Sequence, residues 1–199
     1  MKTSIARIIS AAAGVVALGS GLYAAHARGQ ANPAAQGSRH VANLDAAGRL
    51  TRPADLDRWV FLGASLGMNY NDAAFSVEHP GAFQVVLMEP IAYQYFKEHG
   101  HYADGSMFLL SFYETQRGAS IDRAGFVPGS LNAFEIHVVD HTRYAEGHAF
   151  FLFDKDAHDS TAQAPGNPCV KCHVPNGAYD GTFAQFYPPI RNLIPKPAK

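Results

Sequence analysis

The sequence predicts an α+β domain, mainly β, built from an antiparallel sheet with a few short helices. Three observations support this fold class. Hydrophobic residues make up 47% of the 199 residues and charged residues 17%, which is enough apolar material for one core but little for two. Residues 131–139 alternate between apolar and polar side chains, as half-buried strands do. Glycines and prolines separate several other short apolar runs, which is typical of strands joined by turns.

The N-terminus has the form of an export signal. Lys2 and Arg7 precede an apolar run from Ile8 to Leu22, and a small-x-small cleavage pattern ends at Ala27. We therefore expect a secretory signal peptide over residues 1–27. An uncleaved membrane anchor is the alternative, because the apolar run approaches spanning length. Its many Ala and Gly residues make the run weakly hydrophobic, which favours cleavage.

The next segment lacks the pattern of a folded element. Residues 28–52 are rich in Ala, Gly, Gln, Asn and Ser without a sustained period, so we expect a flexible leader before a domain over residues 53–195. Cleavage would remove Lys2 and Arg7 and change the formal charge from −1 to −3. Because the chain has no basic cluster, nucleic acid is not expected as a partner. No later apolar run is long enough to cross a bilayer.

The first elements of the domain are short. Residues 54–59 predict a short helix that leads into a strand at residues 60–63. Residues 83–88 form an apolar run rich in Val, which favours a second strand.

A helix follows that second strand. Ile91–His99 carries an apolar face, Pro90 suits the first helical position, and Gly100 suits the end of the helix. Asp104-Gly105 is a turn signal, and it predicts that a strand begins near Met107 and runs to Tyr113.

The C-terminal half predicts two more strands. Glycines and a proline at 125–129 indicate a connection. In the strand at 131–139, one face carries Phe134, Ile136 and Val138, and the other carries Glu135 and His137.

An aromatic strand follows at 149–153, and residues 154–168 are polar, as in a loop. The cysteine-containing segment and residues 178–186 are expected to be short helices, the second ended by the prolines at 188 and 189.

Both cysteines lie in one pentapeptide, Cys169-Val170-Lys171-Cys172-His173. Its C-x-x-C-H form is the attachment motif of c-type haem. Two thiols one helical turn apart can add to the two vinyl groups on one edge of a porphyrin, and the following histidine then supplies its imidazole to the iron. The motif predicts one covalent haem c held by Cys169 and Cys172, with His173 as the metal ligand. Export agrees, because c-type haem is attached outside the cytoplasm.

Other uses of two cysteines fit less well. A disulfide between them would close a tiny loop and gain little chain entropy. A thioredoxin-like pair would follow a strand in a βαβ unit, whereas this pair follows a loop in a β-rich chain. A structural zinc site would need four ligands, and the chain has no second cysteine pair.

No pattern designates a ligand for the opposite face of the iron. A haem that only carries electrons usually has a second strong ligand, Met or His. Met68, Met88 and Met107 are available, but the last two lie in apolar strands, which is typical of core residues. Among the histidines His137 stands out, because it shares a strand face with Glu135.

Segments on both sides of the haem motif match a known family. They are Arg58-Trp59-Val60, Tyr93-Gln94-Tyr95, Gly100 to Phe108, Gly125 to Asp140, Cys169 to His173 and Asp180 to Pro188. On these segments the chain resembles the cytochrome P-460 and cytochrome c′-beta family of periplasmic haem proteins. The resemblance implies a β-rich fold, usually a homodimer, that holds a high-spin haem with an open distal site.

The two branches of that family differ at one position. The P-460 branch oxidises hydroxylamine and has a lysine cross-linked to its haem, whereas the c′-beta branch binds nitric oxide in an apolar pocket. Counted from Asp104-Gly105, the lysine falls at position 110, where this chain has Leu110. No lysine occurs between Lys97 and Lys155, so we expect no cross-link. Leu110 and three aromatic residues are expected to keep the distal side apolar: Phe83, Phe108 and Phe112.

Glu135 matches a glutamate near the distal pocket of the hydroxylamine-oxidising branch. If it faces the haem, burial would raise its pKa and let it accept a proton from a bound substrate. An exposed or salt-bridged carboxylate is the alternative, because strand alternation does not tell which face meets the haem.

Three hypotheses on function result. The first is a periplasmic protein that binds nitric oxide at a five-coordinate iron. The second is an enzyme that oxidises hydroxylamine or reduces peroxide, with Glu135 as the catalytic proton acceptor. The third is a simple electron carrier, in which His137 or a methionine completes the coordination of the iron and a periplasmic electron-transfer partner exchanges electrons with it.

Overall fold

The computed structural model describes residues 42–68, 76–119 and 121–196. The expected signal peptide and the first part of the expected leader lie outside the described residues. Within the described part of the chain, no helix has both the length and the apolar character that crossing a membrane requires.

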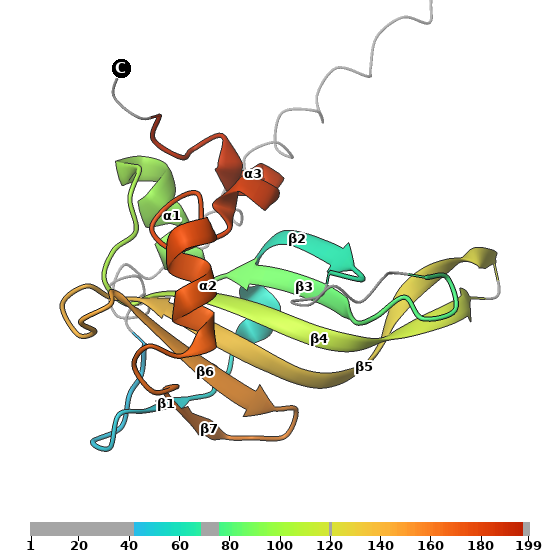
Figure 1. The fold of residues 1–199 in the computed structure, drawn as a ribbon, viewed down its shortest axis with the longest axis horizontal. Coiled ribbons are helices and arrows are strands. Elements are labelled where there is room, and N and C mark those ends of the chain that lie inside the picture. The colour runs from blue at the N-terminus through green and yellow to red at the C-terminus, as the bar shows by residue number, and fades with distance from the viewer. Residues whose placement is uncertain (1–41, 69–75, 120, 197–199) are drawn as a thin grey trace, which may run out of the picture. The chain divides into compact units, whose positions relative to one another are not determined.

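A five-stranded antiparallel sheet forms the centre of the domain (Figure 1). Its strands follow one another in the order of the sequence, and each neighbouring pair is antiparallel. The α+β, mainly β fold class predicted from the sequence is therefore confirmed. The strands are β2 (Val60–Leu66), β3 (Phe83–Met88), β4 (Ser106–Ala119), β5 (Asp122–Val139) and β6 (His148–Asp154).

The structure also contains a two-stranded sheet that was not predicted from the sequence. Its strands are β1 (Arg49–Thr51) and β7 (Asp159–Thr161), which pair antiparallel. Leu50 of β1 is wholly buried and belongs to a hydrophobic cluster of the domain. Residues 42–51, which the composition placed in the flexible leader, are therefore part of the folded domain. Strands of three residues are too short to produce a recognisable period, and this is why both were missed.

The helix α1 (Pro90–His99) confirms the prediction made from its end signals. The Glu89 side chain accepts a hydrogen bond from the Ala92 backbone N–H at 2.7 Å, and Gly100 ends the helix in the left-handed conformation, with φ 71°. The other helices are short. They are the 3-10 helices η2 (Leu56–Arg58) and η3 (Ala184–Phe186), and the α-helices α2 (Pro168–Asn176) and α3 (Pro188–Arg191).

The two faces of the central sheet pack against different layers. On β5, Phe134, Ile136 and Val138 are buried in the cluster that also contains Leu50, and this confirms the predicted alternation. Glu135 and His137 lie on the opposite face, where the C-terminal segment packs. Figure 1 shows α2 lying across this face of the sheet. The C-terminal segment therefore covers the face that carries the two polar residues of β5.

Three local predictions are wrong. Residues 125–129 lie within β5, because that long strand accommodates its glycines and proline at register shifts opposite β4. Residues 178–183 do not form a helix, since Tyr179 and Thr182 form an isolated bridge across a turn. Pro188 and Pro189 begin α3 rather than end a helix, because a proline needs no hydrogen-bond partner for its nitrogen in the first turn.

Candidate haem-binding site

The helix α2 presents the attachment motif on one face. The Asn167 side chain caps the helix and accepts hydrogen bonds from the backbone N–H groups of Cys169, at 2.8 Å, and Val170, at 3.1 Å. Residues three and four positions apart lie on the same side of a helix, so Cys169, Cys172 and His173 are neighbours. Both thiols are free and partly buried.

Hydrogen bonding fixes the orientation of the His173 ring. Its Nδ1 lies 2.9 Å from the backbone oxygen of Gly181. A carbonyl oxygen can only accept, so Nδ1 carries the proton and donates it, and Nε2 keeps its lone pair. The rings of Phe150 and Phe183 pack against the imidazole, with centroids at 4.8 and 4.6 Å. Burial lowers the pKa of His173 and favours the neutral ring, which is the form that binds metals.

Gly177 allows this arrangement. A Cβ atom at position 177 would lie 2.7 Å from the backbone of Gly181 and Thr182, and 2.8 Å from the backbone oxygen of His173. These are backbone atoms that cannot move aside by changing a rotamer. The segment that accepts the His173 hydrogen bond can therefore approach α2 this closely only if residue 177 is glycine.

We expect Gly177→Ala to destabilise the protein by about 1–3 kcal/mol, because the methyl group pushes the 181–182 backbone away from α2. The midpoint of denaturant unfolding of the haem-loaded protein measures this change. Ala178→Ser is the control, because Ala178 is the exposed neighbour. Equal midpoints for Gly177→Ala and the wild type would show that the close contact is not needed.

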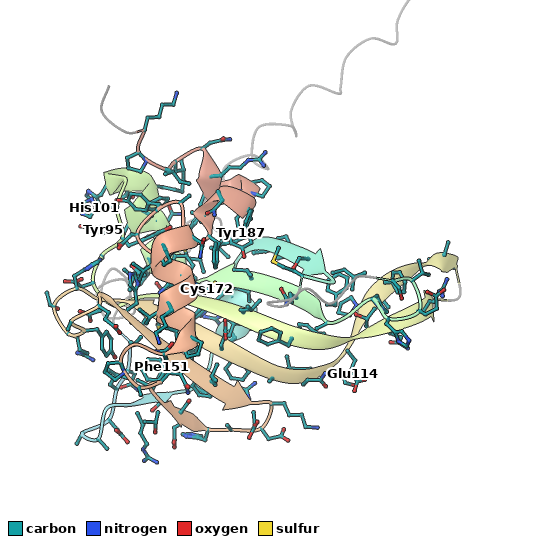
Figure 2. The ribbon with its side chains drawn as sticks, in the orientation of Figure 1. Tyr95, His101, Glu114, Phe151, Cys172 and Tyr187 are labelled. Carbon is teal, nitrogen blue, oxygen red and sulfur yellow. The ribbon has the colours of Figure 1, made fainter. Side chains whose placement is uncertain are left out.

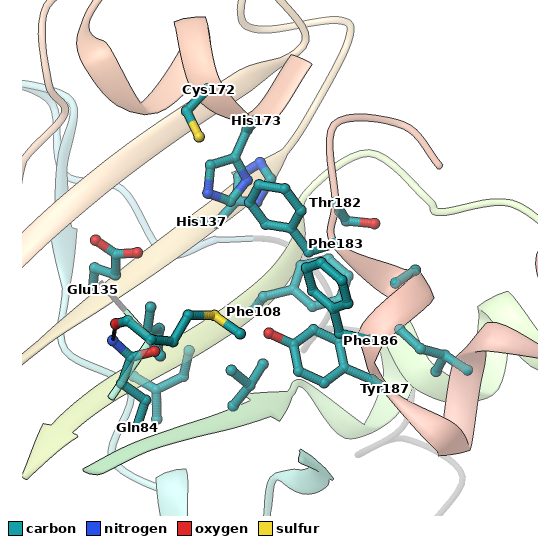
Figure 3. Close-up of a pocket in the computed structure, with 16 residues that line it drawn as sticks. Gln84, Phe108, Glu135, His137, Cys172, His173, Thr182, Phe183, Phe186 and Tyr187 are labelled. Carbon is teal, nitrogen blue, oxygen red and sulfur yellow. Dashed lines mark hydrogen bonds between the residues drawn. The ribbon is translucent and has the colours of Figure 1, made fainter. Parts of the chain in front are cut away.

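A cavity of about 240 Å³ lies between the sheet and the C-terminal segment (Figure 3). Its sheet wall comes from β3, β4 and β5, and its other wall from α2 and the residues that follow it. Figure 2 shows Cys172 on α2 and Tyr187 just before α3, both near this part of the sheet. The lining residues are Met68, Gln84, Val86, Phe108, Leu109, Leu110, Glu135, His137, Cys172, His173, Thr182, Phe183, Ala184, Phe186, Tyr187 and Ile190.

The cavity brings together most of the residues that the sequence singled out. Phe108, Leu110 and Glu135 line it together with Cys172 and His173. Cys169 lies on the same helix but is not among the lining residues; burial and the nearby Glu135 carboxylate raise the pKa of its thiol. Phe83 and Phe112, expected beside Leu110, are also not among the lining residues.

Several lining residues were missed by the sequence analysis. Gln84 comes from β3, while Thr182, Phe183, Phe186 and Tyr187 come from the C-terminal segment. The only available signal for the second group was its position after the haem motif, within a segment that resembles the family. No periodic pattern indicated that Gln84 faces a cavity.

Glu135 is a half-buried carboxyl group that lines the cavity. It pairs with Leu110 across the β4–β5 ladder, and both side chains line the cavity. Burial raises the pKa of Glu135 from its ordinary value of 4.5 to about 7. At neutral pH this group can therefore both release and accept a proton.

The raised pKa predicts a pH-dependent effect of Glu135→Gln on stability. Below pH 4.5 the carboxyl is protonated in the folded and the unfolded state, so the substitution changes little. Above pH 7 the folded wild type holds a partly desolvated carboxylate, which is unfavourable, and the neutral amide of the variant avoids this cost. We expect the variant to be more stable than the wild type by about 2 kcal/mol at pH 8, with the difference vanishing at pH 4. Thermal unfolding at both pH values tests this, and a pH-independent difference would contradict it.

His137 lies beside His173. The centroids of the two rings are 5.1 Å apart and the ring planes nearly perpendicular, so the rings are in edge contact. Nε2 of His137 is joined to Nδ1 of His148 by a hydrogen bond of 3.0 Å. A ligand on the opposite face of the iron would have the porphyrin between itself and His173. Because these two rings touch, the position of His137 does not suit that role.

The methionines named as possible iron ligands lie in different places, and only one of the three borders the cavity. Met107 is buried in the cluster on the other face of the sheet, and Met88 is buried in a cluster with Phe96 of α1. Met68 lines the cavity, and its side chain is 48% exposed. Among the described residues, it is therefore the methionine that borders the candidate site.

The residues of the site fit a c-type haem. Two free thiols and an imidazole with a fixed, unprotonated Nε2 lie on one face of α2, which is the donor set that such a haem requires. Cys172 and His173 border a cavity whose other walls are largely apolar, as a porphyrin ring needs. Cys169, Cys172 and His173 would hold the group.

Comparison with known proteins agrees with this geometry. The family model described as cytochrome P460 matches residues 53–184, which is most of the described domain. A search of curated proteins found no match. The matched region contains β2 to β7, α2 with its attachment motif, and the first residue of η3. The chain therefore belongs to the cytochrome P460 family and is a haem-binding cytochrome.

Proposed function

We propose that this protein is an exported c-type cytochrome with one covalently attached haem, and that it binds nitric oxide at an open coordination position of the iron. Cys169 and Cys172 would form the two thioether bonds, and His173 would be the axial ligand. When bound, the haem supplies an iron atom with one free position for a small molecule. The chain supplies the shape and polarity of the space around that position.

The apolar wall that β3 and β4 contribute to the cavity is the observation that carries this proposal. Val86, Phe108 and Leu110 line the cavity from β3 and β4. Such a wall excludes anions and disfavours water, while it admits small uncharged molecules such as nitric oxide. Leu110 occupies the position at which the resemblance places a cross-linking lysine, and a leucine side chain has no nitrogen that could form such a bond.

Hydroxylamine oxidation is the second candidate, and one specific observation favours it. Glu135 lines the same cavity with a pKa of about 7. A carboxyl group with a pKa near the operating pH is suited to accepting a proton from a substrate. Peroxide reduction would use the same group. For either activity, Glu135→Gln is expected to lower the rate by roughly 10²- to 10⁴-fold.

An optical spectrum of the ferrous protein separates these candidates. The nitric oxide proposal expects an ordinary high-spin c-type spectrum that shifts when nitric oxide is added, without turnover of hydroxylamine. Turnover with an electron acceptor would favour the second candidate. A six-coordinate spectrum at rest, insensitive to carbon monoxide, would overturn both and favour an electron carrier with Met68 as the second ligand.

The location and the assembly of the protein are part of the same proposal. The N-terminal pattern supports export to the periplasm, where an electron-transfer partner would reduce the haem. The family resemblance supports a homodimer. Cell fractionation and the mass of the purified protein in solution test these two points.

A further inference from the structure

Tyr187 holds a fixed position at the edge of the haem cavity. It lies between η3 and α3, and its backbone oxygen accepts hydrogen bonds from the N–H groups of Ile190, at 3.1 Å, and Arg191, at 2.9 Å. Its ring lies close against β2: a Cβ atom at Gly63 would lie 2.9 Å from Cδ1 of Tyr187. The backbone and the ring are thus both held in place, which directs the phenol group.

The hydroxyl group of Tyr187 points into the cavity. Figure 3 shows it on the side opposite His173, directed toward the centre of the cavity. Among the residues that the structure describes, no side chain or backbone group forms a hydrogen bond with this hydroxyl. A hydroxyl that faces a cavity and has no partner in the described chain is free to donate to a molecule in that cavity. Such a group is expected to find its partner in whatever occupies the cavity.

Gln84 gives a useful contrast, because its amide is already engaged. Ser65 Oγ donates to its Oε1 at 3.1 Å, and its Nε2 donates to the backbone oxygen of Met68 at 2.9 Å. The Met68 carbonyl can only accept, so it fixes which end of the amide is the nitrogen. Gln84 thus ties β3 to the end of β2. Of these two polar residues, Tyr187 is the one whose hydrogen-bonding group has no partner in the described chain.

The Tyr187 hydroxyl remains a donor at neutral pH. Burial, and the negative charge of Glu135, raise the pKa of Tyr187 above its ordinary value of 10. The phenol therefore keeps its proton under all conditions in which the protein is expected to work. Glu135 contributes an acceptor to the same cavity.

The geometry points to Tyr187 as a positioning and selectivity residue, whose hydroxyl donates a hydrogen bond to the outer atom of the small molecule held at the haem. This inference rests on the proposed open iron site. It specifies the ligand class: small molecules whose outer atom accepts a hydrogen bond, such as those with N–O or O–O bonds, are preferred over carbon monoxide, a poor acceptor.

The carbon monoxide and nitric oxide complexes of the reduced, haem-loaded protein test the inference by infrared spectroscopy. A donor near the outer oxygen lowers the stretching frequency of the bound molecule. We expect Tyr187→Phe to raise the C–O and N–O frequencies and to abolish the small shift that D₂O causes in the wild type. Nitric oxide should also dissociate roughly three- to tenfold faster from the variant, as expected for one lost hydrogen bond.

Phe186→Leu is the matched control, because it changes the adjacent lining residue without affecting a hydrogen bond. Equal frequency shifts in both variants would indicate a change of cavity shape and overturn the inference. Binding of carbon monoxide with identical frequencies in wild type and Tyr187→Phe would also overturn it, while the proposed function stands. Failure of the wild type to bind carbon monoxide would instead remove the open site, and the role of Tyr187 with it.

Discussion

Replacing both Cys169 and Cys172 with alanine is expected to make the haem fully extractable. Both thiols are free and lie one turn apart on α2, so in the wild type each can form one thioether bond to the porphyrin. The double variant keeps His173 and the cavity, but the haem is then held only by coordination and contact. After denaturing electrophoresis, the haem stain should remain on the wild-type band and disappear from the variant. Acid-acetone extraction should release haem from the variant alone.

Two controls limit the interpretation of that experiment. Lys171→Ala changes an exposed residue between the two cysteines and should retain the stained band. Each single cysteine variant should retain a weaker band, because one thioether suffices to keep the haem on the chain. A stained band in the double variant would show that another side chain forms the covalent bond. Cys169 and Cys172 would then lose their proposed role.

Local chemical patterns predicted much of the fold and the residues proposed to attach the haem. The attachment motif needs only five consecutive residues, and Pro90 and Gly100 marked the two ends of α1. The alternation along β5 placed Glu135 and His137 on one face, and the structure confirms that pairing. These features depend on contacts within a few residues, and this is why they can be recognised in the sequence alone.

The remaining features depend on contacts between distant segments. Glu135 faces the cavity because the C-terminal segment folds back over that side of the sheet, which alternation alone does not reveal. Tyr187 reaches the same cavity from a turn between two very short helices. The fixed tautomer of His173 depends on Gly181, which lies eight residues further along the chain.

His137 shows how a sequence-based candidate can acquire a different role. Its strand face suggested a second axial ligand. In the antiparallel β5–β6 pair His137 lies opposite Phe150, so His148 is a diagonal neighbour and their ring nitrogens meet at 3.0 Å. Burial, together with the charges of His173 and His148, lowers the pKa of His137 well below its ordinary value. A neutral His137 packs against His173 and supports its position.

Replacing His173 with alanine is expected to separate attachment of the haem from its coordination. The thioether bonds should persist, so denaturing electrophoresis should still show a stained band. The spectrum of the ferrous protein should change, because the imidazole that Gly181 orients is gone. The lost contacts with Phe150 and Phe183 should lower the free energy of unfolding by about 2–4 kcal/mol. His158→Ala, at a side chain 86% exposed, should alter neither property.

Rescue of the His173→Ala variant by added imidazole tests directly whether His173 binds the iron. The substitution leaves a space between Phe150 and Phe183, and free imidazole that enters it should restore the ferrous spectrum. If His173→Ala has the wild-type spectrum without imidazole, another nitrogen must replace it. His137 is then the nearest candidate, since its ring lies 5.1 Å from that of His173. In that case, adding His137→Phe to His173→Ala would change the spectrum. If His173 is the iron ligand, His137→Phe alone would leave the wild-type spectrum unchanged.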